Sequence, residues 1–182
     1  MHMLDANKLG ALGTMIADRT KTALASLSPS AAALLSLLHF KPGLTVTRLA
    51  EIAGVSQPTA VRLIDGLERE ALLTRGKPQG RVTPLLLTDA GRERAVFIQD
   101  RRLAALDGLL SSLAPKDRRQ FEFLLDRILA GATTSRASAQ TACRLCEHDL
   151  CEPAVCPIGR RAGEIERQAA RPDVNDHQGD AR

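Results

Sequence analysis

The chain has 182 residues, of which 44% are hydrophobic and 25% charged, and its formal net charge is +4. This length favours one main domain with an appendage, and the mild positive charge permits nucleic-acid binding without requiring it. Aromatic residues are limited to four Phe, which favours a core of packed aliphatic helices and disfavours a single-strand binder that stacks bases. No apolar run approaches the roughly 18 residues of a membrane span, so we expect a cytosolic protein.

The N-terminal part of the chain predicts two helices. Residues 4–27 are rich in Ala and Leu and lack Pro, and residues 30–40 form a shorter apolar segment that ends at Lys41-Pro42-Gly43. Two further helices are expected over residues 45–53 and 57–70. Gly54 suits the left-handed position after the first of these, and Ser56 suits the N-cap of the second.

The next segment changes from helical to strand-like character. Residues 72–74 and 82–87 are strand-like, and the turn between them is rich in Gly, Pro and basic residues. Pro84 indicates an edge strand. Helices are then expected over residues 88–113 and from Pro115 to Gly131, where Gly131 ends the last one.

Two helices joined at Gly54 and followed by a basic hairpin form a winged helix-turn-helix, so the predicted fold class is mainly α. The second helix of such a unit can enter the major groove with its N-terminal residues facing base edges. We therefore predict base-reading residues there and basic contacts from the wing. The candidates are Ser56, Gln57, Thr59, Ala60 and Arg62 on the helix, and Arg75, Lys77 and Arg81 on the wing. Val61, Leu63, Ile64 and Leu67 are expected to form the buried stripe of the same helix.

The residues that carry this pattern resemble the MarR family. The resemblance rests on Gly54-Val55-Ser56-Gln57-Pro58-Thr59, on Arg62 to Arg69 and on Leu87-Thr88-Asp89-Ala90-Gly91-Arg92. It covers roughly residues 4 to 130 and implies a winged-helix dimer that binds a palindromic operator, with the first and last helices of the domain at the dimer interface. Two residues depart from the family pattern: Gln79 stands where the wing usually carries an acid, and Pro84 is unusual in the returning strand.

An apolar face on the last predicted helix is a second sign of dimerisation. Phe121, Leu124, Leu125, Ile128 and Leu129 recur at helical spacing. This face fits a contact between two copies of the chain or packing within one domain equally well.

All four cysteines lie close together near the C-terminus. Cys143, Cys146, Cys151 and Cys156 have the spacing C-x2-C-x4-C-x4-C, and four thiolates within so short a segment suit one tetrahedral zinc ion. An iron–sulfur cluster is the main alternative, because Cys156-Pro157 is similar to the end of ferredoxin motifs. A redox pair of Cys143 and Cys146, or thiols without a function, remain further options, and His148 could replace one ligand.

These features divide the chain into four parts: a MarR-type domain over residues 1–131, a linker over 132–142, a four-cysteine metal-binding loop over 143–160 and a flexible tail over 161–182. We predict a homodimeric regulator, a repressor, that binds double-stranded operator DNA and responds to zinc, an iron–sulfur cluster or a small-molecule effector. The alternative is a metal-binding interaction module that uses the helix-turn-helix only for packing. Motifs of phosphate-binding loops, serine hydrolases and metalloproteases are absent from the sequence, so we do not expect an enzyme.

Overall fold

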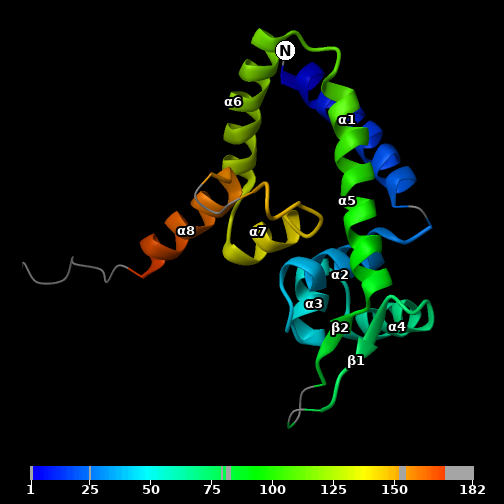
Figure 1. The fold of residues 1–182 in the computed structure, drawn as a ribbon. Helices are drawn as coiled ribbons and strands as arrows, with labels where there is room; N and C mark the ends of the chain where they lie inside the picture. The colour runs from blue at the N-terminus through cyan, green and yellow to red at the C-terminus, as the bar shows by residue number, and fades with distance from the viewer. Residues whose placement is uncertain (1, 25, 79, 81–82, 152–154, 171–182) are drawn as a thin grey trace, which may run out of the picture.

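The structure is a computed structural model that describes residues 2–24, 26–78, 80, 83–151 and 155–170. In these residues it contains eight helices and one antiparallel sheet of two strands, which confirms the mainly α fold class (Figure 1). The elements in chain order are α1 (His2–Ala23), α2 (Pro29–Phe40), α3 (Val46–Ala53), α4 (Gln57–Arg69), β1 (Leu73–Arg75), β2 (Leu85–Leu87), α5 (Asp89–Leu110), α6 (Pro115–Ala132), α7 (Arg136–Ala142) and α8 (Pro157–Ala169).

The winged-helix lobe is built from α2, α3, α4, the two strands and the first half of α5. Its core is aliphatic, as the shortage of aromatics predicts, with Leu34, Leu35, Leu49 and Ile64 at 0% exposure. Hydroxyl caps begin the four helices of this lobe, because a Ser or Thr side chain accepts a hydrogen bond from the third backbone N–H of each. These caps are Ser28, Thr45, Ser56 and Thr88.

The wing is held on the lobe by close backbone contacts. Leu73 pairs with Leu87, and Thr88 donates from its hydroxyl to the carbonyl of Ala71 at 2.7 Å. Gly91 lies so close to Leu72 that a Cβ built on it would stand 1.8 Å from the Leu72 carbonyl oxygen. The returning strand begins only after Pro84, whose carbonyl accepts from the Gly76 N–H at 2.9 Å.

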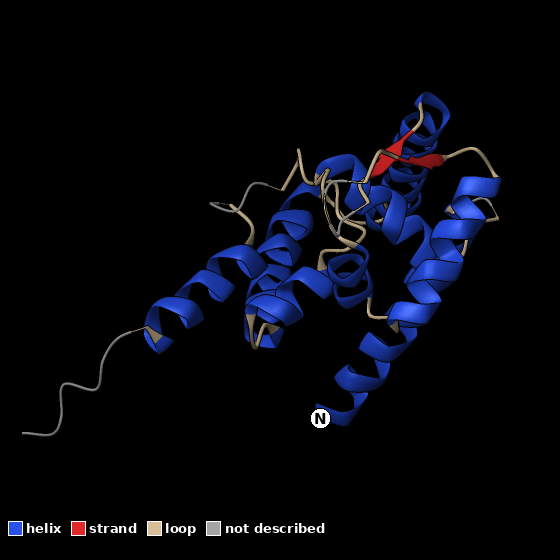
Figure 2. Ribbon diagram, turned by 90° about the horizontal axis from the view of Figure 1, so that it is seen from below, coloured by secondary structure: helices blue, strands red, loops and turns tan. Residues whose placement is uncertain are grey.

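The helices outside this lobe form two arms, one of α1 with α5 and one of α6 with α7 and α8. Helix α1 packs along α5, while α6 runs down on the other side of the molecule to α7 and α8 (Figures 1 and 2). Within the described residues, no helix combines the length and apolar character needed to cross a membrane.

The C-terminal part differs from the sequence expectation. Residues 136–142, predicted to be part of a linker, form α7, because Ser135 and Ser138 make a reciprocal capping box that begins a helix. Gly131 does not end α6, which continues to Ala132. Residues 157–169, divided in the prediction between the cysteine loop and a flexible tail, form α8; residues 171–182 lie outside the described part.

Candidate nucleic-acid interface and cysteine cavity

The N-terminus of α4 is shaped by its cap and by the turn before it. Gly54 has φ +70°, the left-handed conformation that the sequence predicts. The Ser56 hydroxyl accepts from the Thr59 N–H at 3.3 Å and lies 2.8 Å from the Thr59 hydroxyl. Gln57 is exposed in this first turn, so its amide is free to meet a ligand at the lobe surface.

The buried stripe of α4 differs by one residue from the predicted one. Ala60 is fully buried, although we expected it at the DNA-facing surface, and Val61 is 39% exposed, although we expected it in the core. The reason is that Ala60, Ile64 and Leu67 share one face at helical spacing, and this face packs on the lobe. Arg62 points to solvent and, within the described residues, forms neither a hydrogen bond nor an ion pair.

Arg75 does not lie free at the wing tip. Its guanidinium bonds Asp65 at 2.6 Å and also pairs with Glu68, both on α4. The hydrogen bond that Arg75 donates to Asp65 is the main reason why the pKa of Arg75 is raised. Arg75 therefore braces β1 against α4. Lys77 is exposed in the turn, whereas Arg81 and Gln79 lie outside the described residues.

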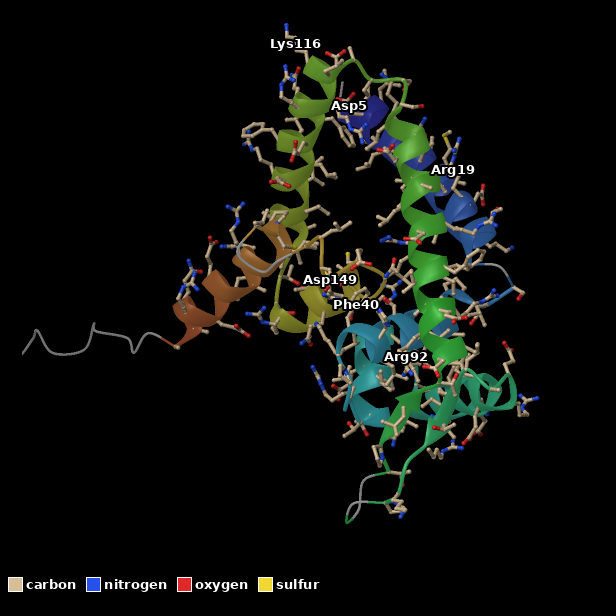
Figure 3. The ribbon with its side chains drawn as sticks, in the orientation of Figure 1. Asp5, Arg19, Phe40, Arg92, Lys116 and Asp149 are labelled. Carbon is tan, nitrogen blue, oxygen red and sulfur yellow. The ribbon has the colours of Figure 1, made fainter. Side chains whose placement is uncertain are left out.

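The four predicted cysteines line a single cavity of about 110 Å³ between α7, α8 and the end of α2. This space is small compared with the roughly 300–1,000 Å³ of drug-sized ligand pockets, so it suits an ion or a compact cluster. His148 lines the same cavity, and its ring contacts Phe40 with centroids 5.3 Å apart. Figure 3 shows Phe40, at the end of α2, next to Asp149 of the cysteine segment.

The thiols fall into two interacting pairs, Cys143 with Cys146 and Cys151 with Cys156. In the described part of the chain, no group of three or more His, Cys, Asp or Glu side chains is placed so that it could hold a metal ion as it stands. The structure thus brings the four sulfurs to one cavity but leaves them paired as thiols.

The two thiols of the first pair have different pKa values. The hydrogen bond from Cys143 lowers the pKa of the Cys146 thiol to about 6, and the charge of Arg102 lowers it further against the effect of burial. The same bond raises the pKa of Cys143, and burial raises that of Cys151 to about 12. Burial also lowers the pKa of His148, which keeps its ring neutral near pH 7. Cys146 is therefore the more acidic thiol of its pair.

The cysteine segment is joined to the winged-helix lobe. Leu145 packs against the main hydrophobic core, and Gln99, on α5 and 3% exposed, donates to the Cys146 carbonyl at 3.1 Å. Sequence reasoning missed Gln99 and Arg102, because a polar residue within a long helix gives no signal of what it faces until the tertiary fold is known.

An apolar face is left uncovered on α6. None of the described residues of this helix is buried, and Phe123, Leu124, Leu125 and Ile128 are 38–61% exposed. Of the predicted face, Phe121 and Leu129 are half-buried and Leu129 packs against the apolar cluster of α7 and α8, whereas Leu124, Leu125 and Ile128 are exposed. Apolar side chains of α1 are exposed as well, notably Met3, Leu4 and Leu9.

Comparison with known proteins agrees with this architecture. The model of the MarR family matches residues 25–81, which span α2 to the wing. A MarR family protein of Mycobacterium tuberculosis in complex with salicylic acid is 26% identical, with a TM-score of 0.54 over 66% of this chain and 92% of that one. The same family protein in complex with DNA is 23% identical over 68% of this chain and 95% of that one, with a TM-score of 0.57. A MarR family protein of Bacillus stearothermophilus is 21% identical over 73% and 96%, with a TM-score of 0.64.

No curated protein matches the sequence. The family match falls on the helix-turn-helix itself, and the solved structures share the surrounding fold, so residues 25–81 are similar to the MarR family and the rest of the domain has the fold of MarR family structures.

Proposed function

We propose that this regulator binds duplex operator DNA as a homodimer and represses transcription. The observation that carries the proposal is the open N-terminal turn of α4, where Gln57 and Arg62 are exposed beside the wing. A recognition helix of this kind reads bases from the major groove with residues near its N-terminus. A MarR family protein of similar fold has been solved in complex with DNA, which supports DNA binding by this fold.

Each site residue has a separate role in this proposal. Arg62 suits a bidentate contact to guanine and Gln57 one to adenine. Ser56 and Thr59 shape the first turn of α4 and contact the nearby DNA backbone. Lys77 and Arg81 are proposed to hold phosphates or the minor groove from the wing. Arg75 positions the wing through its ion pairs with α4.

The base-reading role of Arg62 can be tested by fluorescence anisotropy on DNA from upstream of the gene. We expect Arg62→Ala to weaken specific binding by about 1–3 kcal/mol, and to relax the preference at one base pair. Arg69→Ala is the matched control, since Arg69 is exposed at the other end of α4. Equal losses with both variants, or none, would argue against this role.

Homodimerisation is proposed from the uncovered apolar surface of α6 and α1. A chain that reads one half-site makes few base contacts, and a two-fold dimer doubles them at a spacing of about one helical turn. Repression follows if the bound dimer occupies promoter DNA. A reporter behind the upstream region should rise in expression when the gene is deleted; a fall would indicate activation instead.

We further propose that the cysteine cavity binds zinc through Cys143, Cys146, Cys151 and Cys156. Four sulfurs on one small cavity supply the donor set that a structural zinc site uses. Zinc binding would form four metal–thiolate bonds and release the thiol protons to solvent. Zinc near one equivalent per chain in anaerobically purified protein is the expected result. Iron with visible absorbance would assign a cluster, and neither metal would overturn the proposal.

A small-molecule effector is the remaining part of the proposal. A related MarR family protein has been solved with salicylic acid, so aromatic acids are the first compounds to test here. We expect such a ligand to lower operator affinity in the anisotropy assay, and a panel of aromatic acids without effect would count against it.

A further inference from the structure

The cysteine cavity is connected to helix α5 by two neighbouring side chains. Gln99 Nε2 donates to the Cys146 carbonyl at 3.1 Å and to the Ser36 hydroxyl on α2 at 2.9 Å. Arg102, one helical turn further along α5, lies close enough to Cys146 for its charge to lower the pKa of that thiol. The same face of α5 thus contacts both the winged-helix core and the cysteine segment.

Arg102 has an unsatisfied donor at this site. Its Nη1 is buried and has no hydrogen-bond partner within the described residues. A buried guanidinium N–H without an acceptor is costly, and a nearby anion removes the cost. One zinc ion with four thiolates carries two net negative charges, so a loaded cysteine site would supply the anion that Arg102 lacks.

The cysteine segment also contacts the first helix of the helix-turn-helix. Arg48 on α3 donates to the Gln140 side chain on α7 at 2.8 Å. At the turn after α3, a Cβ built on Gly54 would lie 3.7 Å from a methyl carbon of Thr141. Helix α7, which leads directly into Cys143, therefore packs against α3 and against the turn that sets the position of α4.

We infer that Arg102 is the counter-charge of the thiolate centre and that a loaded centre holds α7 against α3, so that operator affinity depends on loading. This inference rests on the proposed DNA and zinc binding. The contacts of α7 with α3 and with the turn at Gly54 leave the N-terminal turn of α4 exposed. The loaded form is therefore the DNA-binding form, and loss of the centre releases α7 and weakens binding.

The test compares Arg102→Met with Arg101→Met. Arg101 is the adjacent residue on α5 and is exposed, with its guanidinium 5.5 Å from the centre of the Phe97 ring. Zinc affinity is measured by competition with a chromogenic chelator, and operator affinity by anisotropy of zinc-loaded and zinc-stripped protein. We expect Arg102→Met to weaken zinc binding about 10–100-fold, as loss of a partner around the metal ligands does. Arg102→Met should also reduce the difference in operator affinity between zinc-loaded and zinc-stripped protein. Arg101→Met should leave both the zinc affinity and this difference unchanged.

The outcomes separate this inference from the proposals beneath it. Wild-type protein that binds operator equally well with and without zinc overturns the inference and leaves DNA binding intact. Wild-type protein that binds no operator overturns the proposed function itself, and protein that takes up no zinc overturns the site. Zinc affinity unchanged in Arg102→Met rules out the counter-charge. If that variant does not fold, Arg102→Lys, which keeps the charge, should bind zinc more weakly than wild type but respond to loading; an unchanged zinc affinity would overturn the role of Arg102.

Discussion

Gly91 shows how one missing side chain sets the position of the wing. The backbone of Leu72 occupies the space where a Cβ would stand, so α5 and the start of the wing can approach only at a glycine. Gly91 is one of the residues that carry the MarR resemblance in the sequence. The reason why a glycine is needed there is visible only in the fold.

We expect Gly91→Ala to destabilise the protein by roughly 1–3 kcal/mol, because the backbone must move to admit the methyl group. Gly108→Ala on the same helix is the matched control. There an added Cβ has only an ordinary contact at 3.7 Å with Arg19, so helix propensity should stabilise the protein by up to about 1 kcal/mol. Urea denaturation measures both, and a neutral Gly91→Ala would mean that the wing does not depend on this contact.

The burial of Ala60 and the exposure of Val61, the reverse of the prediction, show where reasoning from residue type fails. Valine is the more apolar of the two, yet the smaller alanine is buried. The spacing to Ile64 and Leu67 decides which face is buried, and tight helix packing selects the small residue.

Among the elements, the winged helix could be predicted from the sequence and α7 could not. The elements of the wing and of helices α2 to α5 each carry local signals, such as the Ser56 cap and the Gly54 turn, and these agree with the structure. Helix α7 contains only small and polar residues. Such a composition is typical of a linker, and here the capping box and packing against neighbouring helices override it.

A salt bridge between α7 and α8 gives a pH-dependent prediction. Arg136 binds Glu166 through two hydrogen bonds, of 2.9 and 2.5 Å, and the bond from Arg136 lowers the pKa of Glu166. A carboxylate whose pKa is lowered in the folded state stabilises it above the unfolded pKa of about 4.3. This contribution is lost as the pH falls through the lowered value.

We therefore expect Glu166→Gln to lower the urea midpoint slightly at pH 7 and to match wild type at a pH below the lowered pKa. Glu164→Gln is the control, since among the residues that the structure describes Glu164 pairs only with Arg161 on the same helix, at 3.3 Å. A difference between Glu166→Gln and wild type that stays constant with pH would show that the charge of Glu166 is not the cause.

For the whole molecule, the uncovered face of α6 predicts an assembly. Leu124 and Ile128 are 45% and 53% exposed on a helix that buries none of its described residues. We expect Ile128→Glu to convert a dimer to monomer in sedimentation, with association at least about tenfold weaker, because a charge would enter an apolar contact. Leu86→Glu, on the wing strand, should leave the dimer intact. A monomeric wild type would show that this face has another partner.

The position of Leu145 has a consequence for biosynthesis. This side chain comes from the cysteine segment, yet it packs against the core of the winged-helix lobe. Domains fold as they leave the ribosome, N-terminal parts first. The DNA-binding lobe therefore gains this contact only after the stretch around Leu145, with the first two cysteines on either side of it, has emerged. A nascent chain would complete the packing of this lobe only when Cys143 and Cys146 are already outside the ribosome.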